Sequence, residues 1–295
     1  MPALRARAAA LPAEVRGAAC LILACALFAF MDATAKGLMQ RYDPFQVVWA
    51  RYLGQALIVL AIVSPRLGTV VRSRRPALQA FRSGLLFCST LCGFFAFSVM
   101  PLAEAVAIFQ TAPLMIVALA ALVLRERVGP RRWSGVAFGF LGALVIVRPG
   151  AETFQPAALL PLLGALTFAG YSIATRFLGR DDGWATTFLY TAALGAVAAS
   201  LFVPMVWVTP TATDALIMLS MGFVGSAGQF MLIVAFNTAP ASAIAPFTYA
   251  GLIFSALAGY VAFGERPDLW TAAGAAMIAG AGIYVWMRER ALAGT

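Results

Sequence analysis

Four charged side chains fall within or at the ends of long apolar segments of this 295-residue chain, namely Asp32, Lys36, Arg51 and Glu104. A charge in hydrocarbon costs roughly 3 kcal/mol on insertion scales, so such residues are kept when they are paired or face a polar cavity. Asp32 lies nine residues before the turn near Arg41, and Arg51 lies ten residues after it, which places both at about the same depth. Opposite charges at one level predict an ion pair that acts as a gate or as a contact for a zwitterionic solute.

Lys36 and Glu104 lie nearer one end of their segments and form what we call the outer charge cluster. Lys36 follows Asp32 by four residues and shares its helix face. Attraction to lipid head groups, or a pinning network between helices, explains Lys36 and Glu104 at least as well as contact with a solute does. For Asp32 and Arg51, which lie deeper, the same structural explanation is the alternative to a functional role.

Uncharged polar side chains at helical spacing would line the rest of a path through the bundle. The candidates are Gln110, Thr111, Tyr171, Thr175, Gln229, Asn237 and Tyr249, with Trp49 as an interior ring. Single hydroxyls in lipid often bond back to their own helix or join neighbouring helices, so a structural role remains open for each. The amide side chains need partners, and a ring near Arg51 would favour a flat or aromatic solute.

Residues for catalysis or metal binding are scarce. The chain has no histidine, and Cys20, Cys25, Cys88 and Cys92 lie in apolar segments that suit small packing residues. There is no Gly-x4-Gly-Lys-Ser/Thr sequence, and Lys36 is the only lysine. We therefore expect no enzyme activity, no metal, no cofactor and no ATP-driven pumping. An intramembrane enzyme or a channel remains an alternative to a carrier, but the residues present favour these two less.

The elements that must position these residues are membrane spans. Hydrophobic residues make up 62% of the chain and charged residues 11%, with a mean hydropathy of +0.88, whereas soluble domains carry about 25% charged residues. Apolar segments long enough to cross a bilayer are spread over the whole chain. We predict ten spans, over 17–37, 45–64, 78–99, 102–124, 133–148, 157–177, 184–206, 215–236, 241–263 and 270–287.

An internal repeat organises these spans. Pro101 to Gly142 and Pro240 to Gly280 share a small-residue span, a Glu-Arg pair and a glycine-rich span opened by tryptophan, at an offset of 139 residues. We expect two five-span repeats, 1–150 and 151–295. Because five is odd, the second repeat must be inverted, and folds of this kind place the substrate in a central cavity and work by alternating access. Pro113 and Pro246 are expected to interrupt the fourth and ninth spans.

Arginine placement predicts the orientation. With both termini in the cytoplasm, sixteen of the 21 basic residues lie on the inner side. They are Arg5, Arg7, Arg16, Arg66, Arg72, Arg74, Arg75, Arg82, Arg125, Arg127, Arg131, Arg132, Arg176, Arg180, Arg288 and Arg290. The positive charge is thus a topology signal rather than a nucleic-acid site. We expect a multi-pass protein of a bacterial-type inner (plasma) membrane without a cleaved signal. Its partners are the bilayer and a small-molecule substrate; a monomer would suffice for the cavity, and a dimer stays an open alternative.

Several motifs resemble those of the EamA family of the drug/metabolite transporter superfamily. They are Pro101-Leu102-Ala103-Glu104-Ala105, Arg125-Glu126-Arg127-Val128, Gly264-Glu265-Arg266-Pro267 and Ile283-Tyr284-Val285. The resemblance covers nearly the whole chain, but the motifs concern packing and span ends and say little about substrate. It implies a helical bundle around a cavity between the two halves, and transport without ATP. Members of the family export amino acids, including aromatic ones, or import riboflavin or S-adenosylmethionine.

These observations together predict a secondary transporter for small neutral or zwitterionic metabolites. Export of amino acids, including aromatic ones, is the leading hypothesis. Uptake of riboflavin or S-adenosylmethionine is the alternative.

Overall fold

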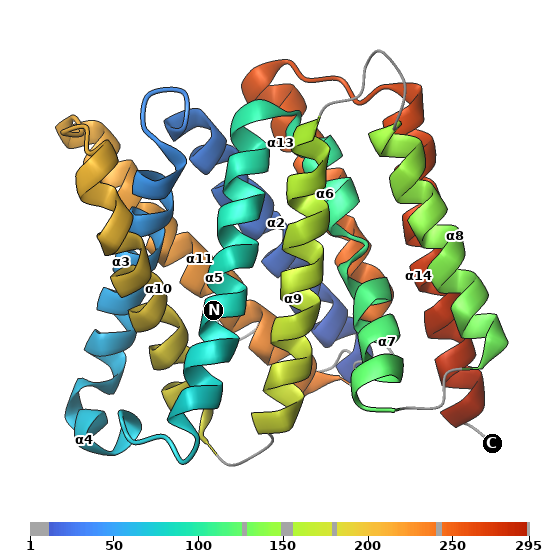
Figure 1. Ribbon diagram of the computed structural model, residues 1–295, viewed down its shortest axis with the longest axis horizontal. Coiled ribbons are helices and arrows are strands. Elements are labelled where there is room, and N and C mark those ends of the chain that lie inside the picture. The colour runs from blue at the N-terminus through green and yellow to red at the C-terminus, as the bar shows by residue number, and fades with distance from the viewer. Residues whose placement is uncertain (1–11, 126–128, 149–155, 179–181, 240–243, 294–295) are drawn as a thin grey trace.

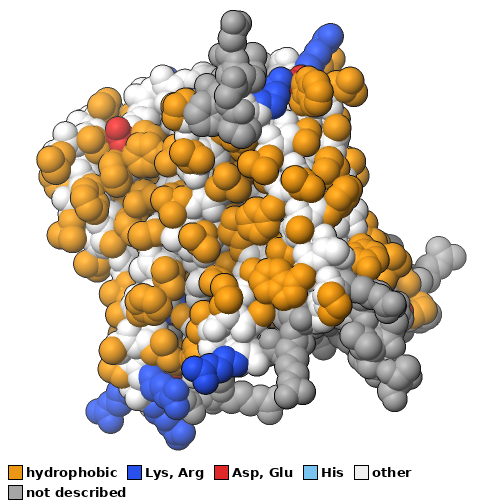
Figure 2. Space-filling view, turned by 45° about the vertical axis from the view of Figure 1, so that its right-hand side comes forward, with side chains coloured by type: hydrophobic (Ala, Val, Ile, Leu, Met, Phe, Trp, Pro, Cys, Tyr) orange, Lys and Arg blue, Asp and Glu red, His pale blue; other side chains and the backbone are white. Residues whose placement is uncertain are grey.

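The computed structural model describes residues 12–125, 129–148, 156–178, 182–239 and 244–293, and these residues form helices and connecting turns. Nine helices in this part of the chain are long and apolar enough to cross a membrane, and Trp133–Val147 is a shorter apolar helix. Large hydrophobic side chains such as Leu201 and Ile253, each 71% exposed, cover the outside, as expected where lipid replaces water. Figure 2 shows them across the middle of the molecule, with lysine and arginine toward its two ends.

Helix boundaries follow the apolar segments closely. The first repeat contains α2 (Ala13–Leu38), α3 (Pro44–Val63), η1 (Ser64–Arg66), α4 (Leu67–Val70), α5 (Pro76–Val99), α6 (Leu102–Phe109), α7 (Ala112–Val123) and α8 (Pro130–Val147). The second contains η2 (Pro156–Ala158), α9 (Leu159–Leu178), α10 (Trp184–Val206), α11 (Ala212–Thr238), η3 (Ala245–Tyr249), α13 (Ala250–Phe263) and α14 (Leu269–Ala293). Capping side chains mark where some of these helices begin. The side chains of Asp43 and Thr211 accept hydrogen bonds from backbone N–H groups in the first turns of α3 and α11.

Packing between the repeats is symmetric. Helix α2 packs on α11 and α5 packs on α9, so exchanging the repeats turns one contact into the other; α7 on α9 and α13 on α2 are related in the same way. Helices α3 and α10 pack together, as do α8 and α14, which lie side by side in Figure 1. The ten-helix bundle of two inverted repeats is therefore confirmed, and the short fifth span α8 packs along its repeat partner.

The fourth and ninth spans are both broken, and at matching positions. Gln110 and Thr111 separate α6 from α7, and η3 gives way to α13 after Tyr249, which is Gln110 plus the 139-residue offset. The break in the fourth span precedes Pro113, because proline fits in the first turn of a helix such as α7. Nε2 of Gln110 donates to the carbonyl oxygen of Thr248 at 3.4 Å, so the two breaks meet at the centre of the bundle.

We name the two ends of the bundle after the predicted topology. The inner end carries α4, at the bottom of Figure 1, and the α4–α5 connection that contains Arg72 and Arg74. The outer end carries the α13–α14 connection, which contains Glu265 and Arg266.

Candidate functional site

Asp32 on α2 and Arg51 on α3 are half-buried inside the bundle. Among the described residues no salt bridge joins them, so the direct ion pair predicted from their depth is not formed in this conformation. Arg51 nevertheless lies close enough to act electrostatically on the Asp32 carboxylate, which accepts no hydrogen bond from another described residue. The two opposite charges lie near each other without a direct salt bridge between them.

Arg51 is held in place by neutral groups. Its guanidinium carbon lies 5.1 Å from the ring centroid of Tyr52 and 5.8 Å from that of Phe94. Its Nη1 donates to Oγ1 of Thr90 at 3.4 Å, and the same oxygen bonds the Tyr52 hydroxyl at 2.9 Å. The buried Nε has no partner in the described part of the chain and lies over Gly225 of α11. Aromatic faces stabilise a cation without removing its charge, so this guanidinium can still bind an anion.

Lys36 binds the second repeat rather than Asp32 or Glu104. Its Nζ lies 2.5 Å from Oε1 of Glu265 and donates to the carbonyl oxygen of Met100 at 2.6 Å. Sequence reasoning identified both charged residues but could not pair them, because the pairing depends on how the repeats pack.

A second connection at the outer end, which we call the outer clamp, joins the α2–α3 turn to α11. Oδ2 of Asp214 accepts hydrogen bonds from Nη1 of Arg41 at 3.0 Å and from the Tyr42 hydroxyl at 2.8 Å. Gln46 adds two bonds to the backbone of Val208. The inverted repeat places a related connection at the other end of the molecule.

That connection, the inner clamp, joins the α9–α10 loop to the start of α5. Asp182 accepts hydrogen bonds from the Ser73 hydroxyl, from the backbone N–H of Arg74 at 2.9 Å and from Nε2 of Gln79 at 2.9 Å. Partial burial raises the pKa of Asp182, but these hydrogen bonds outweigh it and hold the pKa below its ordinary value. The inner clamp therefore depends on an ionised carboxylate.

Arg82 is the functional candidate that sequence reasoning missed. The topology argument counts it among the inner-side basic residues, yet it lies in α5 with only 3% of its surface exposed. It donates to Tyr171 at 2.9 Å and Thr175 at 2.8 Å on α9, and to Thr191 at 3.3 Å on α10. No described carboxylate pairs with it directly. Tyr171 and Thr175, predicted to contact substrate, are thus engaged in holding the two repeats together.

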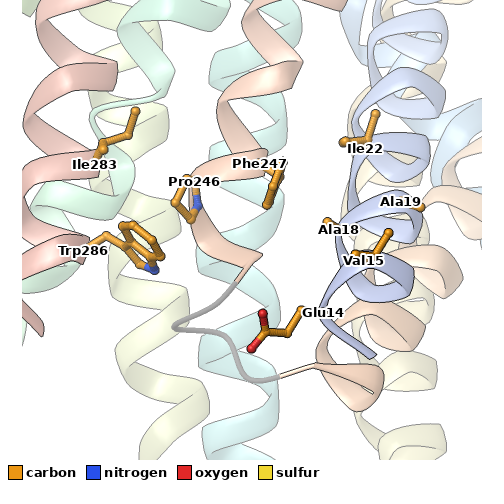
Figure 3. A pocket seen from close by; sticks show the side chains of 9 residues that line it. All are labelled: Glu14, Val15, Ala18, Ala19, Ile22, Pro246, Phe247, Ile283 and Trp286. Carbon is orange, nitrogen blue, oxygen red and sulfur yellow. The ribbon is translucent and has the colours of Figure 1, made fainter. Parts of the chain in front are cut away.

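An apolar cleft of about 590 Å³ opens near the inner end, between α2, η3 and α14. Figure 3 shows Val15, Ala18 and Ile22 on one side and Pro246 and Trp286 on the other. Among the described residues that line it, Glu14 at the start of α2 is the only charged one. A smaller cleft of about 390 Å³ occupies the related place between α7, α8 and α9.

A family model described as the EamA-like transporter family matches residues 15–148 and again residues 155–287. The chain belongs to this family. One solved crystal structure has 25% sequence identity to the chain and a TM-score of 0.61, covering 92% of this chain and 97% of that one. The EamA assignment, with its two matches, agrees with the repeated packing seen here and makes the protein a multi-pass membrane transporter.

Curated relatives of this EamA-family chain span nearly its full length. An S-adenosylmethionine uptake transporter of Rickettsia bellii is 29% identical over 259 residues, covering 88% of this chain and 89% of that protein. A riboflavin transporter of Brucella anthropi is 27% identical and covers 91% and 98%. A pseudopaline exporter of Pseudomonas aeruginosa is 30% identical and covers 87% and 91%. Transport of a small molecule is thus common to all three, whereas substrate and direction differ.

The other predicted site residues are scattered in this EamA fold. Trp49 donates from Nε1 to Ser200 at 2.9 Å and packs on Trp207, so it faces α10. Thr111 is fully buried and its hydroxyl donates to the carbonyl oxygen of Ile108 in the last turn of α6, and Asn237 is exposed near the inner end of α11. Gln229, Tyr249 and Glu104 are half-buried. The structure therefore brings Asp32 near Arg51 and Gln110 near the break before α13, and it places Trp49 and Asn237 elsewhere.

Around Glu104 the outer end has a further ion pair. Arg148 Nη2 lies 2.8 Å from Oδ2 of Asp268, and both residues act electrostatically on Glu104. Hydrogen bonds from Thr271, with Arg148 adding to them, hold the pKa of Asp268 below its usual range. Glu104 therefore belongs to a charged surface between α6, α8 and α14, and not to the Lys36 pair.

Proposed function

We propose that this chain carries a zwitterionic metabolite with a flat ring, and that S-adenosylmethionine is the first substrate to test. The observation that carries the proposal is that Asp32 and Arg51, on consecutive spans, lie near enough to act electrostatically on each other but form no direct salt bridge. A bound solute with both charges would supply the missing partners. Buried charges are costly until such partners are present.

The chemistry of the solute matches the site group by group. An α-amino acid head group offers an ammonium to the Asp32 carboxylate and a carboxylate to the Arg51 guanidinium, including its unpartnered Nε. The sulfonium of S-adenosylmethionine adds a positive charge that Asp32 also favours. Phe94 and Tyr52 are buried beside Arg51, so a solute ring that reaches the guanidinium would enter an aromatic surrounding. Relatives named as S-adenosylmethionine uptake transporters support this choice.

Export of aromatic amino acids is the second candidate, since these solutes carry the same head group and a ring. Riboflavin shares the flat ring but lacks the amino acid head group, so it would leave both charges unpaired. Riboflavin therefore differs from S-adenosylmethionine and from the aromatic amino acids in not needing Asp32 and Arg51.

Counterflow in proteoliposomes tests the proposal independently of transport direction. Vesicles loaded with unlabelled S-adenosylmethionine should accumulate the labelled compound, and 5′-methylthioadenosine, which keeps the adenine ring but lacks the amino acid, should not compete. Asp32→Asn and Arg51→Gln should each lower the initial rate about tenfold or more, because each leaves one solute charge without its partner.

Arg66→Gln is the matched control, since Arg66 is exposed in η1 and should be neutral. Counterflow of phenylalanine without S-adenosylmethionine would favour the second candidate. Counterflow of riboflavin that neither charge variant alters would refute the zwitterion site itself.

A further inference from the structure

The ends of α2 and α13 that face outward are joined by one partly buried ion pair. Lys36 at the end of α2 and Glu265 just after α13 have side chains only 13% and 17% exposed, and their charged atoms lie 2.5 Å apart. Nζ of Lys36 also lies 5.5 Å from the ring centroid of Phe263, the last residue of α13. Little water reaches this pair, so its attraction is screened far less than that of a surface pair.

Glu265 is positioned by two further features of the fold. Its Oε2 accepts the backbone N–H of Leu102 at 2.8 Å, at the start of α6, where a helix favours negative charge. The carboxylate folds back over Gly259, where a Cβ atom would lie 2.8 Å from Oε2. Lys36 also donates to the carbonyl oxygen of Met100, two residues before α6 begins at Leu102. The pair therefore joins the ends of α2 and α13 to the start of α6.

At the other end of α2 an apolar cleft opens beside η3, although Ala18 and Leu21 still pack on Ile244 just before η3. The 590 Å³ cleft lies between Ala18 and Ile22 of α2 and Pro246 and Phe247 of η3, which leads into α13 (Figure 3). Cys25, about one turn beyond Ile22, is half-buried and its Sγ lies 3.6 Å from the carbonyl oxygen of Thr248. Asp32 follows seven residues later, about 10 Å farther along α2.

We propose that Lys36 and Glu265 form the outer gate of this transporter and that the inner cleft is the mouth of the path toward Asp32. In this structure the gate is closed and the mouth is open. Opening to the outside then requires α13 to leave α2 at Lys36, and the break between η3 and α13 supplies a hinge for this motion. The proposal needs transport by alternating access but no particular substrate.

The native thiol of Cys25 reports on both sides of the gate. In a variant that keeps only this cysteine, with Cys20, Cys88 and Cys92 changed to Ala, a membrane-impermeant thiol reagent should react in inside-out vesicles and not in right-side-out vesicles. Lys36→Met combined with Glu265→Gln removes both charges, so neither is left buried alone. This double variant should raise the rate of labelling from outside about fivefold or more, the usual range for a coupling between sites.

Gly259→Ala provides an independent test that keeps both charges. Its methyl group displaces the Glu265 carboxylate, and outside labelling should rise as well. Gly37→Ala is the control, because Gly37 neighbours Lys36 but a Cβ atom added at this position would meet nothing within 4 Å. Arg148→Met, which breaks the more exposed pair with Asp268, should also leave labelling unchanged.

Two results would overturn the gate. One is a parent protein labelled from outside as fast as from inside. The other is a monodisperse double variant or Gly259→Ala protein with unchanged outside labelling. Since the assay contains no substrate, its outcome is separate from that of the counterflow measurement.

Discussion

At the scale of single residues, Arg82 carries a positive charge into the interface between the repeats. Its donors meet hydroxyl and amide oxygens, and its guanidinium carbon lies 4.6 Å from the ring centroid of Tyr171. Hydrogen bonds from a charged donor are stronger than neutral ones, and a buried donor left without its partner is correspondingly costly. The Tyr171 hydroxyl therefore serves mainly as a hydrogen-bond acceptor for the buried Arg82 guanidinium.

We predict that Tyr171→Phe lowers the free energy of unfolding by about 1–3 kcal/mol, because it leaves Nη2 of Arg82 unpaired while keeping the ring in place. Thermal unfolding in detergent measures this loss. Tyr190→Phe is the control, since the Tyr190 hydroxyl donates to Val71 in an exposed place and should contribute less. If Tyr171→Phe instead leaves the stability unchanged and raises the KM for the substrate, the Tyr171 hydroxyl contacts substrate rather than stabilising the fold.

The sequence carried enough information to identify Asp32, Lys36 and Arg51, because charges are rare in apolar spans and their depth follows from helix geometry. It could not show that Lys36 pairs with Glu265, since that contact joins residues from different repeats. The sequence also could not show that Arg82 differs from the arginines that lie at the membrane surface. Arg82 lies six residues after the start of α5, where its long side chain can either reach the lipid head groups or turn into the bundle.

At the scale of helices and loops, the two clamps are related by the inverted repeat but use different chemistry. The outer clamp has an arginine beside Asp214. The inner clamp holds Asp182 mainly through neutral donors and a backbone N–H. Each clamp centres on a single carboxylate, and Asp182 of the inner clamp lies in the loop before α10, outside the spans.

The pKa of Asp182 lies below its ordinary value of 3.8 in the folded protein. A depressed pKa contributes stability above the unfolded-state pKa, and this contribution is lost as the pH falls through the folded-state pKa. We predict that Asp182→Asn is less stable than the parent by a constant margin above about pH 5, and that the margin shrinks toward pH 3. Unfolding temperatures of both proteins across this range provide the measurement. A margin that is absent at pH 7, or unchanged at pH 3, would contradict the role given to the ionised carboxylate.

Helix boundaries were predictable within a few residues, because apolar runs and capping residues are local features. The break in the fourth span was predictable from Pro113 and lies directly before it, at Gln110–Thr111, because proline cannot continue the preceding helix but fits in the first turn of α7. The fifth span was predictable only through its repeat partner, because Trp133–Val147 is short for a span taken alone.

At the scale of the whole molecule, the symmetry of the packing has a consequence for mechanism. The largest helix contacts between the repeats have counterparts under exchange of the repeats, so a structure closed at one end and open at the other is one of two exchangeable states. The joined outer ends of α2 and α13, with the cleft between their inner ends, fit this description. Which end faces the cytoplasm then decides which way the cavity opens.

We predict that the inner end, with Arg72, Arg74 and Arg75, is cytoplasmic, because basic residues near span ends are retained on that side. Arg74 and Arg266 are both exposed. They belong to the α4–α5 and α13–α14 connections, which lie at opposite ends of the bundle (Figure 1), so single cysteines there, in a cysteine-free variant, report on the two sides. In intact cells an impermeant reagent should label Arg266→Cys and leave Arg74→Cys unlabelled until the membrane is permeabilised. The reverse pattern would invert the topology and turn the Lys36–Glu265 contact into a cytoplasmic gate. Labelling of both from outside would show that the cells leak and would call for sealed vesicles of known orientation.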